Sequence, residues 1–516
     1  MIQIDLDEQR VDIKERTTLG ALLPERSSDC SVAIIRPGEG ESAATGNVRI
    51  YTSAGEIIVE IAEGASDLFS SGPLANLLSD KTKDLLDLKW TDRQAASFGT
   101  FSSDFIPAKK PHSYERGDVI LGCGGYDPKN SHITFSKMRH SADHGAAAGG
   151  GLIGRVVTGK GIPNHWSAGD KIKNIERVIN RADISNSFTT TDADFVLESG
   201  MQIISHVRAV AEGYSDRDVN TATAESVEHL LLSLSDNIFQ VGLATSTHIK
   251  DDRMKMTDVP SELKKSRLEG TITARTSGKS RGSIYIYTND IPGSPAHTVV
   301  GQVEHGIELV KLVSDNEKFN IQITPRQFDL LGITTGRAKE IATERGIKLS
   351  IDDEDNDRVV IKQTPATTLE VLTAGMAELK TLPLSNVVDI RLSDDSAPKT
   401  CKIFREVTGL KWHKIGGMPL LFNFEDVFLF NPKIDRKTKI NLENTPTDIV
   451  PANILAMTND SRKGTGLVGV RTSDNSEFGP TSEPFEGTNI IGEIIDVNKL
   501  DSLKEGELIY IREVPL

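Results

Sequence analysis

Apolar and polar residues near the start of the chain follow a pattern that predicts two strands, a helix and a third strand. Residues 2–6 (IQIDL) and 10–14 (RVDIK) alternate at a period of two, as half-buried strands do. Thr17 and Thr18 can cap a short helix over the apolar run that ends at Leu23. The continuous apolar stretch 31–36 (SVAIIR) then predicts a buried strand, so we expect a small module of strands and one helix at residues 1–44.

The remaining chain repeats one succession of patterns three times. Each copy contains an extended segment, then a helix, and then strands joined by turn-rich loops. The helices have Ser or Thr near their starts and apolar residues spaced three and four apart, and we predict them at residues 71–90, 223–241 and 396–412. The first and third predicted helices end in the same Leu-Lys-Trp sequence, at Trp90 and Trp412.

A single glycine interrupts the apolar strand that ends each copy. These glycines are Gly154 in LIGRVV, Gly301 in VVGQVE and Gly492 in IIGEII. A glycine inside a strand indicates a bulge or the close approach of another backbone, as at the corner of a barrel. Each copy spans about 130 residues, which is the usual size of one domain. The predicted divisions are the module at 1–44, three units at 45–180, 185–327 and 385–516, and a connector of helix and strand at 328–384.

The charge and the cysteine content exclude several classes of protein. Of the 516 residues, 59 are Lys or Arg and 74 are Asp or Glu, which gives a net charge of −15 with neutral histidines. So acidic a chain repels phosphate backbones, and we expect no nucleic acid among its partners. No apolar stretch reaches the roughly 18–20 residues that a membrane span needs, and three separated cysteines make no disulfide framework. We therefore expect a cytoplasmic protein that does not bind membranes.

One segment departs from this acidic character. Residues 250–281 contain nine Lys or Arg and five Asp or Glu, a local charge of +4. The segment either forms a solvated surface or docks an acidic partner, since opposite potentials accelerate association. The sequence leaves both interpretations open.

Parts of all three copies resemble cyclophilins. Residues 390–409 resemble the opening strand and helix of that family, and residues 48–61 its first hairpin. Residues 285–310 resemble its closing half, in which the strand that begins at His297 leads to a helix near Gly306. The resemblance implies closed eight-stranded barrels with capping helices.

The N-terminal module resembles the β-grasp fold of ubiquitin-like sulfur carriers. Those carriers act through a free C-terminal Gly-Gly, whereas this chain continues, so sulfur transfer is not expected. The expected fold class is α+β, mainly β, with tandem cyclophilin-like β-barrels and an N-terminal β-grasp-like module.

Cyclophilin catalysis depends on an arginine in a Phe-His-Arg-like strand, beside a glutamine and an aromatic pocket. The matching segments here are 97–101 (SFGTF), 246–249 (STHI) and 420–424 (LLFNF), and none contains an arginine. Without a guanidinium to polarise the prolyl amide, the electrostatic part of that mechanism is absent. We therefore expect a non-catalytic protein, with peptidyl-prolyl cis-trans isomerase or folding-helper activity as the alternative.

The order and spacing of the module and the three units are similar to those of the methanogenesis marker protein 3 family. The resemblance extends over nearly the whole chain and is strongest at residues 281–313, 385–412 and 484–514. Membership implies a scaffold subunit of the ATP-dependent complex that reductively activates methyl-coenzyme M reductase in methane-producing archaea. The implied partners are the reductase and the other subunits of that complex, including an ATP-binding component, and no intrinsic cofactor is implied.

Cys123, His140 and His144 are the candidate metal ligands. The two histidines are four residues apart, so on a helix they would face the same way and could hold a metal together. Cys123 lies on the strand that leads into this loop. The alternative is a loop stabilised by the glycines of 145–151, with histidines at the surface. An iron–sulfur cluster normally takes four thiolates, and the three cysteines lie in three different units, so this chain could at most complete a cluster shared with a partner.

Overall fold

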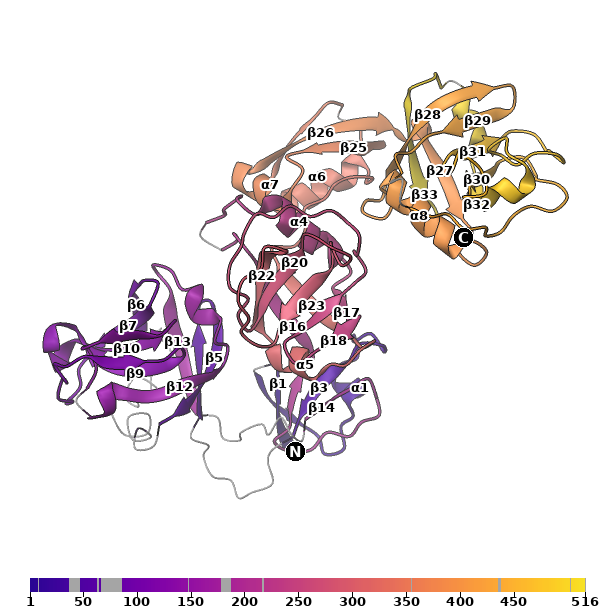
Figure 1. Cartoon of the computed structure of the whole chain (residues 1–516). Helices are drawn as coiled ribbons and strands as arrows, with labels where there is room; N and C mark the ends of the chain where they lie inside the picture. The colour runs from indigo at the N-terminus through magenta and orange to yellow at the C-terminus, as the bar shows by residue number, and fades with distance from the viewer. Residues whose placement is uncertain are drawn as a thin grey trace. The chain divides into compact units, whose positions relative to one another are not determined.

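The chain divides into two units, Met1–Gln327 and Phe328–Leu516 (Figure 1). The computed structural model describes residues 1–7, 9–36, 47–62, 65, 86–146, 148–177, 187–215, 218–353, 355–434, 438–501 and 503–515. Among these residues no helix is both long and apolar enough to span a lipid bilayer.

The N-terminal module is a five-stranded sheet built from two separated parts of the chain. Its strand order is β14-β3-β15-β1-β2, and β15 runs parallel to β1. A Thr18 side chain caps the short helix, as predicted. The elements are β1 (Ile2–Leu6), β2 (Gln9–Ile13), α1 (Leu19–Leu22), β3 (Val32–Ile35), β14 (Phe188–Thr190) and β15 (Gln202–Ile204). A hairpin, a helix and a central parallel pair are the features of a β-grasp-like fold.

The module differs from its predicted extent in one respect. Both edges of the fully buried β3 are paired with strands from beyond residue 187, namely β14 on one side and β15 on the other. The sheet therefore continues past residue 44, and the first barrel is inserted between β3 and β14.

The first barrel is closed, with the strand order β10-β7-β6-β13-β4-β5-β12-β9. Its core contains Phe98, Phe135 and Trp166, whose rings meet edge to face with centroids 4.8–5.9 Å apart. A separate two-stranded ladder joins β8 (His112–Tyr114) to β11 (His140–Ala142). The barrel strands are β4 (Asn47–Thr52), β5 (Gly55–Ile61), β6 (Leu86–Thr91), β7 (Ala95–Phe101), β9 (Asp118–Cys123), β10 (Ser131–Ser136), β12 (Leu152–Thr158) and β13 (Lys171–Arg177).

The prediction of a helix at residues 71–90 is wrong for its last five residues. Residues 71–85 lie outside the described residues, but residues 86–91 form strand β6 and Trp90 is exposed. Leu86 and Leu88 pack on the core while Asp87 and Lys89 face solvent, so these residues follow the strand period of two.

The second unit has the strand order β17-β23-β16-β22-β20-β21-β19-β18. The strands at the two ends of this order, β17 and β18, are consecutive in the chain and separated only by Val241 and Gly242. The amide of Val241 donates to the carbonyl of Glu317, next to β23, and the amide of Gly242 donates to that of Lys250 on β19, so this one segment joins both edges of the eight-stranded sheet into a ring. The elements are β16 (His206–Ala211), α4 (Ala224–Ser233), β17 (Ile238–Gln240), β18 (Leu243–Ala244), β19 (His248–Asp251), β20 (Thr271–Arg275), β21 (Ile284–Tyr287), β22 (His297–His305), α5 (Ile307–Leu312) and β23 (Lys318–Thr324). The helix predicted at 223–241 ends at Ser233, and its last predicted residues belong to β17.

The segment predicted as a connector is a small domain with its own apolar core. The sheet order is β24-β26-β25, and Phe328, Leu330, Val360 and Leu379 are buried within the domain. The elements are α6 (Thr335–Glu344), β24 (Lys348–Ile351), β25 (Arg358–Thr364), α7 (Thr368–Ala374) and β26 (Met376–Pro383).

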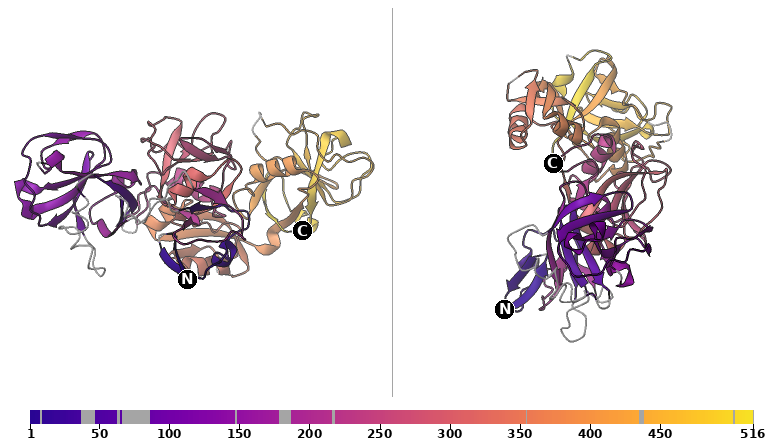
Figure 2. Two further views of the ribbon diagram at one scale, coloured as in Figure 1. Left: turned by 90° about the horizontal axis from the view of Figure 1, so that it is seen from below. Right: turned by 90° about the vertical axis from the view of Figure 1, so that its left-hand side faces the viewer.

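The third barrel is closed, with the strand order β27-β32-β30-β31-β29-β28-β33. Its strands are drawn in orange to yellow in Figure 2. Helix α8 lies within the predicted range 396–412 and buries Cys401 and Phe404 in the barrel core. The elements are β27 (Val387–Leu392), α8 (Pro398–Thr408), β28 (Gly416–Phe424), β29 (Val427–Phe430), β30 (Ile454–Thr458), β31 (Val468–Arg471), β32 (Thr488–Ile494) and β33 (Leu508–Glu513).

The three rings have the same connectivity. When each ring is read from its first core strand, β5-β12-β9-β10-β7-β6-β13 corresponds to β16-β22-β20-β21-β19-β18/β17-β23 and to β27-β32-β30-β31-β29-β28-β33. The first ring contains β4 as an additional strand between β13 and β5. The tandem barrels that the cyclophilin resemblance implied are thus confirmed, although the third barrel closes with seven strands and not eight.

The three repeated glycines occupy equivalent places, and each lies where the strand register shifts. A Cβ atom on Gly154 would lie 2.6 Å from the carbonyl oxygen of Glu60 on β5, and one on Gly301 would lie 2.7 Å from that of Val210 on β16. A Cβ atom on Gly492 would come still closer to the carbonyl of Arg391 on β27. The predicted bulge is confirmed in all three barrels.

Replacing Gly492 with alanine should destabilise the third barrel. The added methyl group must push β32 away from β27, and overpacking of this kind costs about 1–3 kcal/mol. Thermal unfolding of the full chain should show an earlier transition for Gly492→Ala. Gly124→Ala is the matched control, because a Cβ there meets no atom within 4 Å. Equal unfolding temperatures for the two variants would contradict the role of the glycine.

Candidate functional site

Neighbouring strands present an outer face in each barrel, and this face carries the candidate chemistry. In the second barrel Ile272, Ile284 and Ile286 alternate with outward residues, as the equivalent core residues do in the other two barrels. Four outward residues define a tyrosine–histidine face: His248, Tyr285, Tyr287 and His297.

His297 is the central polar group of the tyrosine–histidine face. It is 5 % exposed, its Nδ1 atom lies 2.9 Å from the Thr273 hydroxyl, and the edge of its ring meets the Tyr285 ring at 4.8 Å. Burial, together with the nearby charges of Arg267 and Arg275, lowers the pKa of His297 to about 3. The imidazole is therefore neutral near pH 7.

Arg267 reaches the same face from the loop that precedes β20. Its Nη1 atom donates a hydrogen bond to the Tyr287 hydroxyl oxygen at 2.8 Å, and its guanidinium carbon lies 5.0 Å from the centre of that ring. The sequence comparison with cyclophilins missed this residue because it looked for the arginine on a barrel strand. The one available signal in the sequence was that Arg267 and Tyr287 occur in the same repeat.

The same face of the third barrel is filled by the chain itself. The residue equivalent to Tyr285 is Gly469, and the buried covering segment 479–481 (Gly-Pro-Thr) lies against it, so that a Cβ on Gly469 would overlap the Pro480 carbonyl. Arg471 occupies the position of Tyr287 and donates from Nε to the Gly479 carbonyl oxygen at 3.3 Å. The Thr481 and Thr488 hydroxyls, 3.0 Å apart, also hold the segment.

The Arg471 guanidinium is anchored from its other side. Its Nη1 atom donates to the Asp426 carboxylate at 3.0 Å, and the same carboxylate accepts a hydrogen bond from Ser473. An arginine thus does bind the carbonyl of a Gly-Pro bond, but the proline belongs to the barrel itself.

In the first barrel the outer face carries an aromatic cluster of four histidines and one tyrosine: His112, Tyr114, His132, His140 and His144. The His144 ring is parallel to that of Tyr114, with centroids 5.9 Å apart, and its backbone covers Gly122. Burial, together with His132 and His140, lowers the pKa of His144 to about 4. Burial raises the pKa of Tyr114 to about 12, and its hydroxyl donates to the Gly150 carbonyl at 2.6 Å.

The structure brings together His140 and His144 but not Cys123. The two imidazole centroids are 6.5 Å apart, although His140 lies on strand β11 and not on the helix that the spacing suggested. Alternation along β9 places Cys123 with the core residues Val119 and Leu121, opposite to the side that His144 covers. Burial raises the pKa of the Cys123 thiol.

Within the part of the chain that the structure describes, no group of three or more His, Cys, Asp or Glu side chains is arranged to hold a metal ion. All three cysteines are free and buried. Burial also raises the thiol pKa of Cys30, and it raises that of Cys401 to about 11, so both thiols are protonated near pH 7.

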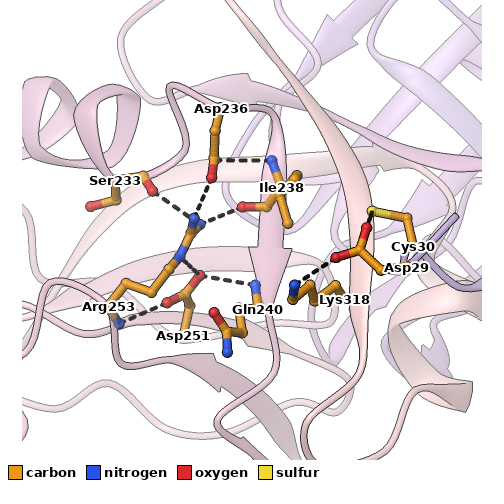
Figure 3. A network of polar contacts seen from close by, with 9 residues as sticks. All are labelled: Asp29, Cys30, Ser233, Asp236, Ile238, Gln240, Asp251, Arg253 and Lys318. Atoms are coloured by element: carbon orange, nitrogen blue, oxygen red, sulfur yellow. Dashed lines mark hydrogen bonds and ion pairs between the residues drawn. The ribbon is translucent and has the colours of Figure 1, made fainter. Parts of the chain in front are cut away.

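Four of the nine cations in the basic segment 250–281 form ion pairs within their own barrel. Arg253 donates to the Asp251 carboxylate at 2.8 Å and to the Asp236 carboxylate at 2.5 Å, and so ties β19 to the end of α4 (Figure 3). Three further cations of the segment form ion pairs, namely Lys250 with Asp252, Lys265 with Glu212 and Arg281 with Asp258. Figure 3 also shows Lys318 on Asp29, which fastens the N-terminal module to the second barrel. These pairs favour a structural role for much of the local charge.

Comparison with known proteins first defines the class of the third barrel. Residues 388–514 match a family model described as "Putative peptidyl-prolyl cis-trans isomerase domain". These residues form the closed third barrel.

Full-length relatives define the family of the whole chain. A UPF0288 protein of Methanosarcina barkeri is 33 % identical, with 99 % of this chain and 98 % of the relative aligned. Those of Methanococcus aeolicus and Methanopyrus kandleri are 29 % and 28 % identical, over 94 % and 99 % of this chain and the same shares of the relatives. The chain belongs to the UPF0288 family, and these three relatives come from methanogens.

Acid should weaken the second barrel through His297. The unfolded histidine has a pKa near 6.5 and the folded one near 3, so between these values the unfolded chain binds the additional proton. Stability therefore falls as the pH drops below about 6.5. Hydrogen exchange of the β20–β22 amides, corrected for intrinsic rates, should show a larger loss of protection from pH 7.5 to pH 5.0 in the wild type than in His297→Phe. An equal loss in both proteins would contradict this assignment.

Proposed function

We propose that this protein is a non-catalytic scaffold subunit of the ATP-dependent complex that reductively activates methyl-coenzyme M reductase. Its partners would be the reductase and other subunits of the activation complex, including the ATP-binding component, in the cytoplasm of a methanogen. The methanogen relatives and the similarity to the methanogenesis marker protein 3 family support the setting. Several rigid barrels on one chain suit a scaffold, because linked binding sites raise the effective concentration of their partners.

The observation that carries the non-catalytic part is the filled outer face of the third barrel. This barrel matches the isomerase family model, yet Gly479, Pro480 and Thr481 are buried against its outer face and occupy it. Topology also corrects one sequence match, since residues 420–424 lie on β28 whereas the strand equivalent to β7 and β19 is β29. None of these three equivalent strands contains an arginine.

An exposed apolar tip on the third barrel supports a docking role. Leu421, Phe422 and Phe424 lie at the end of the β28–β29 hairpin, and Phe424 is 66 % exposed. Large apolar side chains gathered at a surface mark interaction sites more often than isolated ones do. We assign this hairpin tip as one partner contact of the scaffold.

A second candidate function, prolyl isomerisation, is favoured by one feature of the second barrel. Its outer face combines two tyrosines, a neutral histidine and the Arg267 guanidinium, which are the chemical types that such catalysis uses. However, Tyr287 is 1 % exposed and Tyr285 and His297 are 5 % exposed, so a substrate would first have to displace covering residues.

A protease-coupled assay with proline-containing peptides separates these two functions. The full chain should give no isomerisation above the uncatalysed rate, because the third-barrel face is filled and the second is covered. Turnover that disappears in Arg267→Ala and persists in Arg281→Ala would establish the isomerase instead. Arg281 is a suitable control because it pairs with the exposed Asp258 at the surface.

Anaerobic affinity purification from a methanogen extract tests the scaffold. The wild-type chain should retain reductase and activation-complex subunits at moderate salt, and Phe424→Ser should reduce their recovery at least about tenfold, as loss of an interface hot spot does. The control is Ile106→Ser, which should leave recovery unchanged. Ile106 lies between β7 and β8 of the first barrel and is 76 % exposed. Recovery of the wild type as a lone monomer would contradict the proposed function.

A further inference from the structure

The five carboxylates of the basic segment 250–281 are all engaged within the second barrel. Three of them hold cations of the same segment, and the other two hold Lys311 and the first turn of helix α4. Since four of the nine cations are paired, five remain that form no ion pair with a described residue. These five are Lys255, Lys264, Arg267, Arg275 and Lys279.

The two arginines of this set are held in place, whereas the three lysines are exposed side chains. Arg267 donates from Nε and Nη2 to the carbonyl oxygen of Pro292, at 3.0 Å and 2.6 Å, and from Nη1 to the Tyr287 hydroxyl oxygen. Arg275 donates from Nε to the carbonyl oxygen of Ser277 at 3.0 Å. Both arginine side chains are half-buried, so their guanidinium groups are oriented and still reach solvent.

The acceptors that hold the two guanidinium groups are neutral. A guanidinium has five N–H donors, and hydrogen bonds to carbonyl or hydroxyl oxygens leave its positive charge in place. Each of the two side chains also keeps N–H donors beyond those already used. Arg267 and Arg275, here named the arginine pair, therefore carry two charges that no described carboxylate compensates.

Both members of the arginine pair lie beside one histidine. Arg275 is opposite His297 in the pairing of β20 with β22, and its Nη1 atom is 3.5 Å from the Nε2 atom of His297. Arg267 contacts Tyr287, whose ring centroid lies 6.3 Å from that of His297. After burial, Arg267 also lowers the pKa of the neighbouring His248. The positive charges thus meet at the edge of the same tyrosine–histidine face.

A carboxylate fits such a pair of guanidinium groups. Arginine binds a carboxylate through two parallel hydrogen bonds, and an oriented side chain loses little freedom on binding. Nucleic acid or a charged bilayer would extend over the rest of a chain whose net charge is −15. A short acidic segment can stay within one Debye length of the local positive charge, which is about 10 Å at 0.1 M salt. The distribution of charge therefore favours an acidic protein segment over an extended polyanion.

We propose that the arginine pair of the second barrel docks an acidic segment of a partner protein, while the exposed lysines of the same basic segment steer its approach. The guanidinium groups bind side-chain carboxylates at the edge of the tyrosine–histidine face, so no buried ring has to be uncovered. This inference rests on the proposed scaffold function, for which it specifies the charge of one partner. The site is separate from the apolar hairpin tip at Phe424, which belongs to the third barrel.

Binding of a fluorescein-labelled octaglutamate peptide to the purified full-length chain tests the proposal. Fluorescence anisotropy should show binding at about 50 mM salt that weakens as salt is added, because exposed charges are screened. Octaglutamine should not bind. The double variant Arg267→Gln/Arg275→Gln should weaken octaglutamate binding at least about tenfold, since it removes both charged donors. The matched control, Arg93→Gln/Arg337→Gln, removes two exposed arginines elsewhere and should leave the affinity unchanged.

A second variant keeps the test decisive if the arginine variant does not fold. Lys264→Gln/Lys279→Gln changes two exposed side chains and should lower the affinity about threefold through slower association. Equal affinity of octaglutamate for the wild type and for both variants would overturn the proposal. Tighter binding of a single-stranded DNA octamer or of phosphatidylserine vesicles would also overturn it. Dimerisation of the chain alone that depends on the arginine pair would assign the surface to a second copy instead.

The outcome is distinguishable from that of the scaffold test, because only the purified chain and a synthetic peptide are used. Failure of the scaffold function would appear as recovery of a lone monomer from extract while octaglutamate still binds. Failure of this inference would appear as loss of octaglutamate binding while the partners are still recovered.

Discussion

Closure of each barrel depends on a close approach between two strands: β12 and β5, β22 and β16, or β32 and β27. At the closest point there is no room for a side chain. Gly154, Gly301 and Gly492 meet a backbone carbonyl at this point. The bulge at each glycine allows the strand to bend around the corner while both neighbours remain hydrogen-bonded. Because the ring closes, the inward residues form an apolar core. The outward residues do not contribute to that core and can therefore differ between the barrels.

The three outer faces show what this freedom permits. The position equivalent to Tyr285 is Thr134 in the first barrel and Gly469 in the third. A tyrosine at this position supports an aromatic face, whereas a glycine admits the covering segment 479–481. The chain thus keeps one frame and carries three different surfaces, with a histidine cluster, an Arg-contacted tyrosine pair and a self-filled groove.

The N-terminal module is tied to the second barrel by half-buried polar contacts between residues far apart in the chain. Asp7 accepts hydrogen bonds from the Ser205 amide at 2.8 Å and from the Ser205 hydroxyl, and it lies 3.4 Å from both His206 and His305. Although burial opposes it, these hydrogen bonds lower the pKa of Asp7 well below its usual value. The first barrel is inserted between β3 and β14, so the module consists of two separate parts of the chain. The Asp7 contacts hold this module against the second barrel.

The sequence by itself determined the features that depend on neighbouring residues. The repeated patterns predicted three similar units, the three glycines predicted their bulges, and the Thr18 cap predicted α1. The absence of an arginine was predicted for segments 97–101, 246–249 and 420–424, of which the first two reach β7 and β19 and the third lies on β28. Tertiary structure alone decided that Leu86–Thr91 is a strand, that β14 and β15 complete the first sheet, and that Cys123 points away from His140 and His144. It also brought Arg267 and Pro480 onto outer faces. The physical reason is that these arrangements depend on pairing between residues far apart in the chain, which local periodicity does not encode.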